Sequence, residues 1–252
     1  MNGDALLSAL DLPAGSRVDQ RVPKKLLLDN GAPTAADKRI INDGIEELLW
    51  LAALKPTTIG VPEYRDDVRE YLEIAVLRLT LRVAAKATRL VELVHRAVPY
   101  PLLLLTEHGN WSGLSAAHKR WSQGQMGNTV LDGDVVAAEW DAERDDEHWP
   151  AFRDALALGQ QPRTTLYSLF QGWIDTLYAL HAARTTGAFA VASNAEHAAA
   201  RRDALQECAR LDAEIARLRA AAVKEKQMAR QVELNLELQR IEAAKVAAAK
   251  GI

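Results

Sequence analysis

Apolar positions recur with two different periods in the first third of the chain. Isoleucines and leucines repeat near helical spacing over residues 34–56, which predicts a helix of about five turns, capped by Thr34 and ended by Pro56. The segment "TTIGV" at 57–61 is β-branched and is a short strand candidate. Residues 69–82 first alternate between apolar and other side chains and then become apolar on both faces, which predicts a stronger strand.

The next part of the chain predicts one helix and three strands. Residues 86–98 are amphipathic at helical spacing, and "YPLLLLTEH" at 100–108 predicts a buried strand. Further strands are expected over 111–122 and 127–140, and the Asp132-Gly133 pair suits a type I′ hairpin turn. These elements predict an α+β fold with a mostly antiparallel sheet and flanking helices.

From about residue 148 the pattern is helical. Helices are expected over 147–158 and 162–187, and a last helix is expected to start near Asn194 and to run for about 55 residues. At 1.5 Å per residue such a helix is roughly 80 Å long, so part of it must leave the globule or pair with something. The chain is therefore expected to consist of an α+β body (1–142), a helical pair (143–190) and a long C-terminal coiled-coil-like helix (191–252).

The C-terminal helix carries two apolar stripes. The first steps by threes and fours, or by whole heptads, and is interrupted by Glu225 and Gln239; its positions are 208, 211, 215, 218, 222, 229, 232, 236, 243 and 246. The second consists of Leu234, Leu238 and Ile241. Two stripes indicate more than one partner helix or a change of register. The residues expected to contact another helix, either the helix over residues 164–186 of this chain or a helix of a partner, are Leu211, Ile215, Leu218, Val232 and Leu236.

Charge favours a packing role for this helix over a nucleic-acid role. Residues 195–252 contain eleven Lys or Arg and nine Asp or Glu, a balance of +2, with the signs interspersed at spacings of three and four. A helix that grips DNA would be basic on one side. The charged positions therefore predict a solvated face held by weak ion pairs.

The composition of the chain limits which functions and sites the protein can have. The chain is 48% hydrophobic and 26% charged, with a net charge of −3, so it exerts no global attraction on nucleic acid or an anionic membrane. The single cysteine, Cys208, excludes an internal disulfide and a cysteine-based zinc cluster. The first residues lack a basic signal region, and the run "PLLLL" is far shorter than the roughly 20 residues of a membrane span. A cytoplasmic protein without metal, cofactor or membrane contact is expected.

One group of basic residues is a candidate nucleic-acid site. His118, Lys119 and Arg120 precede Trp121, and the two lysines of "PKK" lie at the expected start of a helix. Basic groups beside aromatic rings hold phosphates and stack bases. The candidate residues are Lys24, Lys25, Lys119 and Arg120, with a sheet edge protected by charge as the alternative.

Catalytic signals are weak. The sequence contains no glycine-rich phosphate loop, no G-x-S-x-G segment and no H-E-x-x-H segment. A metal-dependent nuclease would need Lys119 beside Asp66 or Asp67, and the acidic segment 141–148 is better explained as a solvated connector. A pair formed by His95 with Glu107 or His108 is a further weak candidate, since a helix-face histidine is more often a surface residue. The catalytic residues, if any, stay unknown at this point.

Six stretches in order resemble one family across most of the chain: "DQRVPKKLLLDN", "DGIEELLWLAALKPTTIGV", "LEIAVLRLTLR", "HRAVPYPLLLLTEHG", "LSAAHKRWS" and "KEKQMARQVELNLELQRI". The family is an uncharacterised prokaryotic domain of unknown function. The resemblance implies a locus that also encodes superfamily-2 helicases and DNA adenine methyltransferases, of the restriction-like or phage-defence kind. The family supplies no catalytic residue that can be transferred to this chain.

These observations predict an accessory, non-catalytic subunit of a DNA methylation or restriction-type phage-defence system. It would mediate protein–protein contacts, and direct DNA contacts are left open. The expected partner is the helicase or the DNA methyltransferase of the same locus, or a second copy of the chain through the C-terminal helix. The alternative is an atypical metal-dependent nuclease.

Overall fold

The structure is a computed structural model that describes residues 3–82, 85–124, 127–144 and 146–252. It contains two compact units, Met1–Leu177 and Tyr178–Ile252. The first unit holds a mostly antiparallel six-stranded sheet with helices, and the second is helical. The expected α+β fold with a long helical C-terminal region is confirmed, while the division into three parts at 142 and 190 stays a prediction.

The sheet has the strand order β1-β2-β5-β6-β7-β8. The strands are β1 (Arg17–Arg21), β2 (Ile45–Leu54), β5 (Ile74–Leu81), β6 (Leu102–His108), β7 (Trp111–Trp121) and β8 (Thr129–Asp141). Strands β5 and β6 are parallel and are joined by the crossover helix α5 (Ala87–Ala97), while the other neighbouring strands pair antiparallel. The buried leucine run of β6 therefore lies inside the sheet, as expected for an apolar strand of this kind.

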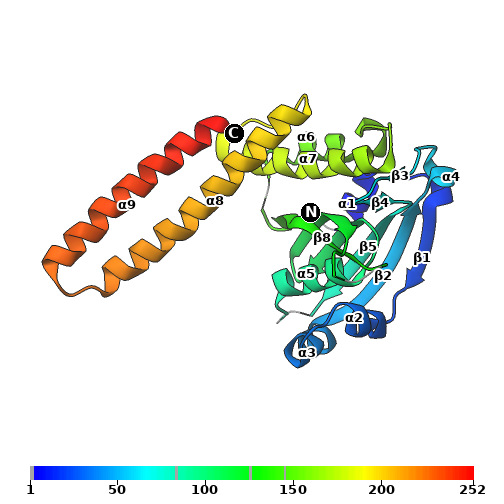
Figure 1. Cartoon of the computed structure of the whole chain (residues 1–252), viewed down its shortest axis with the longest axis horizontal. Coiled ribbons are helices and arrows are strands. Elements are labelled where there is room, and N and C mark those ends of the chain that lie inside the picture. Colours follow the sequence, from blue (N-terminus) through cyan, green and yellow to red (C-terminus); the bar gives the residue numbers. More distant parts are fainter. Residues whose placement is uncertain (1–2, 83–84, 125–126, 145) are drawn as a thin grey trace. The chain divides into compact units, whose positions relative to one another are not determined.

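One face of the sheet is covered by α5 together with α2 (Lys24–Asn30) and α3 (Ala35–Gly44), which lie near one another in Figure 1. The apolar side of α5 packs on β5 and β6 in one hydrophobic cluster. Helices α2 and α5 approach closely because Gly31 follows α2, where a Cβ atom would lie 2.5 Å from the Cβ of Ala97. This face holds one hydrophobic core of the first unit.

The other face contacts α1 (Gly3–Ala9), and α1 in turn contacts α6 (Trp149–Leu156). The short hairpin of β3 (Tyr64–Arg65) and β4 (Glu70–Tyr71) meets β7. The first half of α7 (Leu166–Thr186) contributes Trp173, which is buried and donates from Nε1 to the Leu156 carbonyl at 2.9 Å. Rings of Trp140, Trp149 and Phe152 pack together and hold α6 against β8.

The prediction of a helix over residues 34–56 is wrong for the second half of that segment. Thr34 caps α3 as expected, with its hydroxyl accepting from the Asp37 amide at 3.1 Å, but α3 ends at Gly44 and strand β2 follows directly. Strand β2 lies between β1 and β5, so both of its edges are paired. The leucines and alanines of this segment favour helix locally, and burial between two strands overrides that preference.

Two further expectations in the first unit are wrong. "TTIGV" contributes to a single helical turn, α4 (Pro56–Ile59), which ends at Gly60 with a φ of +66°. The Asp132-Gly133 pair is not a hairpin turn but lies inside β8, at a register shift between β7 and β8. Gly133 has a φ of +89°, and this left-handed conformation accommodates the extra residues of the bulge.

The second unit is a helical hairpin of α8 (Ala195–Lys224) and α9 (Met228–Ala248), which run side by side in Figure 1. Helix α8 starts next to Asn194 as expected, and the Asn194 side chain caps it by accepting from the His197 amide at 2.9 Å. The prediction of one continuous helix of about 55 residues is wrong, because residues 225–227 form a turn between α8 and α9. Glu225 stabilises that turn by accepting from the backbone amides of Lys226 and Gln227 at 2.8 and 2.9 Å.

Within the described ranges the fold also contains single 3-10 turns at Ala14–Ser16, Leu158–Gln160 and Ala249–Gly251. Among the residues that the structure describes, no helix is both long and apolar enough to cross a membrane.

Candidate functional site

The hairpin separates the residues that were expected on one packing face. Leu211, Ile215 and Leu218 of α8 are buried, whereas Val232 and Leu236 of α9 are 52% and 53% exposed. The sequence placed all five on one continuous stripe, and the turn after Lys224 puts the two halves of that stripe in different surroundings. Contact of Val232 and Leu236 with a partner helix stays a prediction.

Helix α9 turns its other apolar stripe, which contains Leu234, Leu238 and Ile241, towards α8. Leu234 is buried, and two ion pairs join the helices: Arg219 with Glu242 at 2.7 Å and Asp212 with Lys245 at 2.6 Å. Both pairs are exposed, so each contributes at most about 1 kcal/mol, and the apolar contact supplies most of the stability. The break at Glu225 was the sequence signal for this arrangement, since it interrupts the first stripe at the turn.

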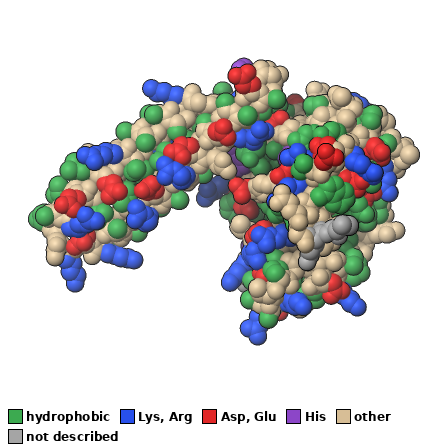
Figure 2. Space-filling view, in the orientation of Figure 1, with side chains coloured by type: hydrophobic (Ala, Val, Ile, Leu, Met, Phe, Trp, Pro, Cys, Tyr) green, Lys and Arg blue, Asp and Glu red, His purple; other side chains and the backbone are tan. Residues whose placement is uncertain are grey.

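The outer surface of the hairpin carries both signs of charge. Figure 2 shows basic and acidic side chains interspersed along it, with hydrophobic side chains between them. Arg210 is paired with Glu207 and Glu214 at 2.7 and 3.2 Å, and Arg230 with Glu233 at 2.6 Å. Ion pairs at these spacings stabilise an exposed helix weakly, and on the face that Figure 2 shows the basic side chains do not gather on one side.

The early lysines lie at the start of α2, as expected. Lys24 is half-buried, and its Nζ donates to the carbonyls of Ile45 and, at 3.4 Å, of Asn42. Burial, helped by nearby Arg82, lowers the pKa of Lys24. Lys25 is exposed. The ammonium group of Lys24 is therefore partly engaged by backbone carbonyls, whereas Lys25 is exposed to solvent.

Lys119 is buried and cannot belong to an exposed phosphate-binding surface. Its side chain is 1% exposed, and Nζ donates to the carbonyl of His95 near the end of α5. Burial lowers the pKa of Lys119 to about 7. The sequence showed a lysine among basic neighbours on a strand, and it gave no sign that α5 would cover that face of β7.

His95 is also buried, which corrects its expected place on the surface. Its Nε2 lies 2.9 Å from the Ser115 hydroxyl, and its Nδ1 has no hydrogen-bond partner among the residues that the structure describes. Burial, together with the charge of Lys119, lowers the pKa of His95 to about 3, so the imidazole is neutral at pH 7. His95 and Lys119 thus form a buried polar contact between α5 and β7.

Arg120 points to the opposite side of β7 and is held in an ion-pair cluster. Its Nε lies 3.7 Å from Asp132, and Arg69 contacts the same carboxylate with a shortest distance of 2.5 Å. The guanidinium of Arg69 also lies 5.7 Å from the ring centroid of Tyr167. Both guanidinium groups share the single Asp132 carboxylate, so this cluster ties the β3–β4 hairpin to β7 and β8 of the sheet.

The residues considered for a nuclease are not brought together. The carboxylate of Asp66 accepts from Tyr64 and from the amides of Val68 and Arg69, within the β3–β4 hairpin. That hairpin meets β7 on the side of His118, whereas the consecutive Lys119 points into the α5 side. The lysine and the carboxylate therefore lie on opposite faces of the sheet.

The acidic segment after β8 forms local contacts. Asp141 accepts from the Glu143 amide at 3.0 Å, and Asp146 accepts from the His148 amide at 3.0 Å. Asp145 lies outside the described residues. Within the described part of the chain, no group of three or more His, Cys, Asp or Glu side chains is placed to hold a metal ion.

A hydrogen-bond chain that the sequence did not indicate runs from β4 to α7. The Tyr71 hydroxyl lies 2.5 Å from His118 Nδ1, and His118 Nε2 lies 2.8 Å from the Gln171 side-chain oxygen. Gln171 in turn donates to Asp175 at 2.9 Å. Tyr71 is fully buried, and burial raises the pKa of its hydroxyl, so it stays protonated. Because Tyr71 is closed to solvent, we assign this hydrogen-bond chain a structural role: it positions α7 on the sheet.

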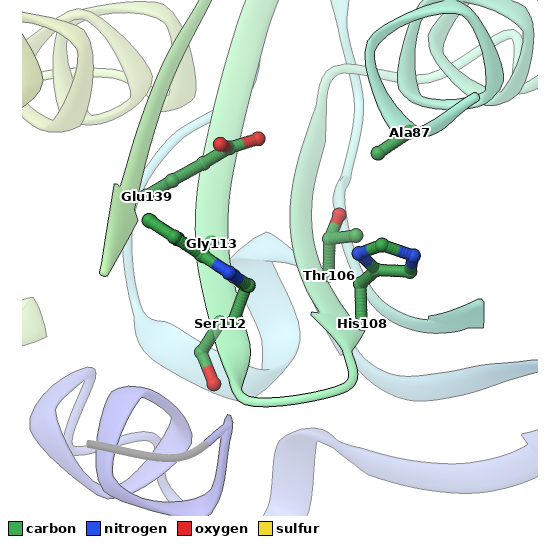
Figure 3. Close-up of a pocket in the computed structure, with 7 residues that line it drawn as sticks. Ala87, Thr106, His108, Ser112, Gly113 and Glu139 are labelled. Atoms are coloured by element: carbon green, nitrogen blue, oxygen red, sulfur yellow. The ribbon is translucent and has the colours of Figure 1, made fainter. Parts of the chain in front are cut away.

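Figure 3 shows a hollow over the ends of three strands, with Thr106 and His108 on β6, Gly113 on β7 and Glu139 on β8. It is open because Gly113 lacks a side chain: a Cβ atom there would lie 3.4 Å from Glu139 and 4.0 Å from Thr106. The volume of about 200 Å³ is below the roughly 300–1,000 Å³ of typical small-molecule sites. Glu107 lies against Gly3 of α1, whereas His95 lies on α5, where it contacts Ser115, so the structure does not bring the candidate pair of His95 and Glu107 together.

A second hollow, here called the α2 hollow, is larger and apolar. Its volume is about 370 Å³, and its lining includes Val22, Leu26, Trp50, Leu77, Val98 and Tyr100. Leu26 and Tyr100 are 50% and 40% exposed at its rim. Exposed apolar side chains around a concave surface are typical of a site that receives an apolar group of another molecule.

The comparisons place the chain in a family without assigning it an activity. The model of a family described as "Domain of unknown function (DUF4391)" matches residues 10–244. No curated protein and no solved structure matches the chain. Because the match covers nearly the whole of both compact units, the chain belongs to the DUF4391 family.

Proposed function

We propose that the protein is a non-catalytic accessory subunit of a DNA methylation or restriction-type phage-defence system, acting in the cytoplasm. Its task is to hold other proteins of that system together. The observation that carries the proposal is that each compact unit presents an apolar surface to solvent. On the first unit this surface is the α2 hollow, and on the second it is the outer face of α9 that contains Val232 and Leu236. A subunit with one such surface on each unit is suited to bridging.

Two further observations support a structural rather than a chemical role. The titratable groups that the sequence singled out, His95, His118 and Lys119, are each engaged in hydrogen bonds between elements of the fold. The resemblance of six stretches to a family encoded beside helicases and adenine methyltransferases supports the choice of partner. The α2 hollow is the surface that we assign to the enzyme of the locus.

Co-expression with the helicase and the methyltransferase encoded beside this protein tests the proposal. We expect one of them to co-purify with the wild-type chain, and Leu26→Glu to reduce its recovery roughly tenfold or more, because a charge in an apolar anchor site is costly to bury. Arg39→Glu on the neighbouring helix α3, at an exposed position, is the matched control and should not change recovery. Failure of both enzymes to co-purify with the wild type would reject the proposal.

A separate experiment tests direct DNA binding by the basic candidate residues other than Lys119. If Lys24, Lys25 and Arg120 bind phosphates, changing all three to Ala should flatten the dependence of log affinity on log salt by roughly 0.9 for each phosphate that is no longer bound. Fluorescence anisotropy with a duplex at several salt concentrations measures the slope. Alanine at the exposed Lys224, Lys226 and Lys250 is the control. An unchanged slope in the first variant would leave its three residues as structural or edge-protecting groups.

A further inference from the structure

Helix α9 is apolar on two nearly opposite faces, and α8 covers one of them. Leu234 faces α8 and is buried, whereas the outer face follows a heptad pattern with steps of three and four. We call this outer face the α9 stripe; its residues are Ala229, Val232, Leu236, Gln239, Ala243 and Val246. All six are exposed, with Val232, Leu236 and Val246 at 52%, 53% and 65%.

The order of side-chain sizes along the α9 stripe fits a second α9 in the antiparallel direction. In that direction Ala229 meets the second copy's Val246, Val232 meets its Ala243, and Leu236 meets its Gln239. Each apolar layer then pairs a larger side chain with a smaller one or with a glutamine, so the spacing between helices stays even. In the parallel direction like residues would meet, and wide Leu and Val layers would alternate with narrow Ala layers.

The charges beside the stripe select the same direction. Glu233 and Arg240 occupy equivalent flanking positions one heptad apart. In an antiparallel pair centred between Leu236 and Gln239, Glu233 of each copy lies opposite Arg240 of the other, which gives two identical ion pairs. In a parallel pair Glu233 would face Met228 and Arg240 would face Asn235, so opposite charges would not meet across the stripe.

The present partners of these two side chains leave them able to form that contact. Glu233 pairs with Arg230 at 2.6 Å on the solvent-exposed surface, a weak contact that one carboxylate can share. Arg240 is exposed, and no ion pair to it is found within the described part of the chain. The surface is thus self-complementary, as a two-fold interface requires.

We propose that α9 pairs antiparallel with the α9 of a second copy of this chain, so that the two hairpins form a four-helix arrangement around the α9 stripes. This deepens the proposed function, on which it rests for its biological purpose: the accessory subunit acts as a dimer, and the α2 hollow of each copy is left for the enzyme. Gln239 beside the two-fold axis is the polar position that fixes the register.

Sedimentation equilibrium of the full chain tests the pairing. Over roughly 1–100 μM, the range in which a modest interface assembles, the wild-type mass should rise from one chain towards two. Leu236→Glu should remain a single chain throughout, while Glu237→Ala, on the solvated side of α9, should behave as the wild type. A wild-type mass of one chain at every concentration would overturn the pairing.

A charge exchange tests the direction. Glu233→Arg alone or Arg240→Glu alone should weaken the dimer roughly tenfold, because two attractive pairs become two repulsive ones. Mixing the two single variants should restore dimers, since one chain then presents arginine at both positions and the other presents glutamate at both. Circular dichroism should show that each variant keeps its helix content. Absence of restoration on mixing would reject the antiparallel arrangement.

These results are separable from those on the proposed function. A dimer that neither enzyme joins would keep the pairing and reject the accessory role. A wild-type chain that stays single, but loses the enzyme on Leu236→Glu, would reject the pairing and assign the stripe to the enzyme.

Discussion

Replacing Lys119 by methionine should stabilise the protein at pH 7 and remove much of its stability change between about pH 7 and 10.5. The lysine is 1% exposed, and its folded pKa is about 7 against the ordinary 10.5. Between those values the unfolded chain holds the proton and the folded chain does not, so the free energy of unfolding of the wild type rises with pH, by about 1.4 kcal/mol per unit. Below pH 7 both states are protonated and that stabilisation is absent.

Methionine keeps an unbranched apolar stem of similar length and buries no charge, so a gain of about 1–4 kcal/mol at pH 7 is expected. Urea unfolding at several pH values between 6 and 10.5, compared for the two proteins, gives the difference in slope. Lys25→Met, at an exposed position, is the control and should leave the slope unchanged. Parallel pH profiles for Lys119→Met and the wild type would show that Lys119 is not buried as described.

Leu211→Ala should destabilise the hairpin of α8 and α9 by about 2–5 kcal/mol, because a buried leucine loses its packing and leaves a cavity. Leu211 is 1% exposed in the seam between the two helices. The second compact unit is small, so a loss of this size should unfold much of it at moderate temperature. Amide hydrogen exchange followed by mass spectrometry should then show faster exchange in residues 195–248, with little change in the sheet.

Val232→Ala is the matched control, because Val232 lies on the face of α9 that is turned away from α8. Val232 is 52% exposed, so at concentrations where the chain is single its replacement should change stability by no more than about 0.5 kcal/mol. Equal losses for Leu211→Ala and Val232→Ala under those conditions would show that the two stripes are assigned to the wrong faces.

Several elements of this protein follow from local sequence alone. Helix α5 and strand β6 were predictable because amphipathic spacing, and a run of four leucines after Pro101, leave few alternatives. The start of α8 was predictable from Asn194, whose side chain caps the helix. The two apolar stripes of the C-terminal region were also visible in the sequence, because helical periodicity is a local property. Most of these signals act within one or two turns of chain.

Tertiary contacts decided the rest. Residues 45–54 have good helix formers and become an inner strand, because pairing with β1 and β5 satisfies both edges and residues 51–54 are buried. Asp132 and Gly133 have the composition of a turn, but the length of β7 opposite them makes them a bulge. Lys119 looked like a surface residue until α5 covered it. Which stripe of α9 faces inward was set by the turn at 225–227, since folding back brings Leu234, not Val232, against α8. Local sequence determines which residues can form an apolar face, whereas only the folded chain decides which face is already occupied, because that depends on groups distant in sequence.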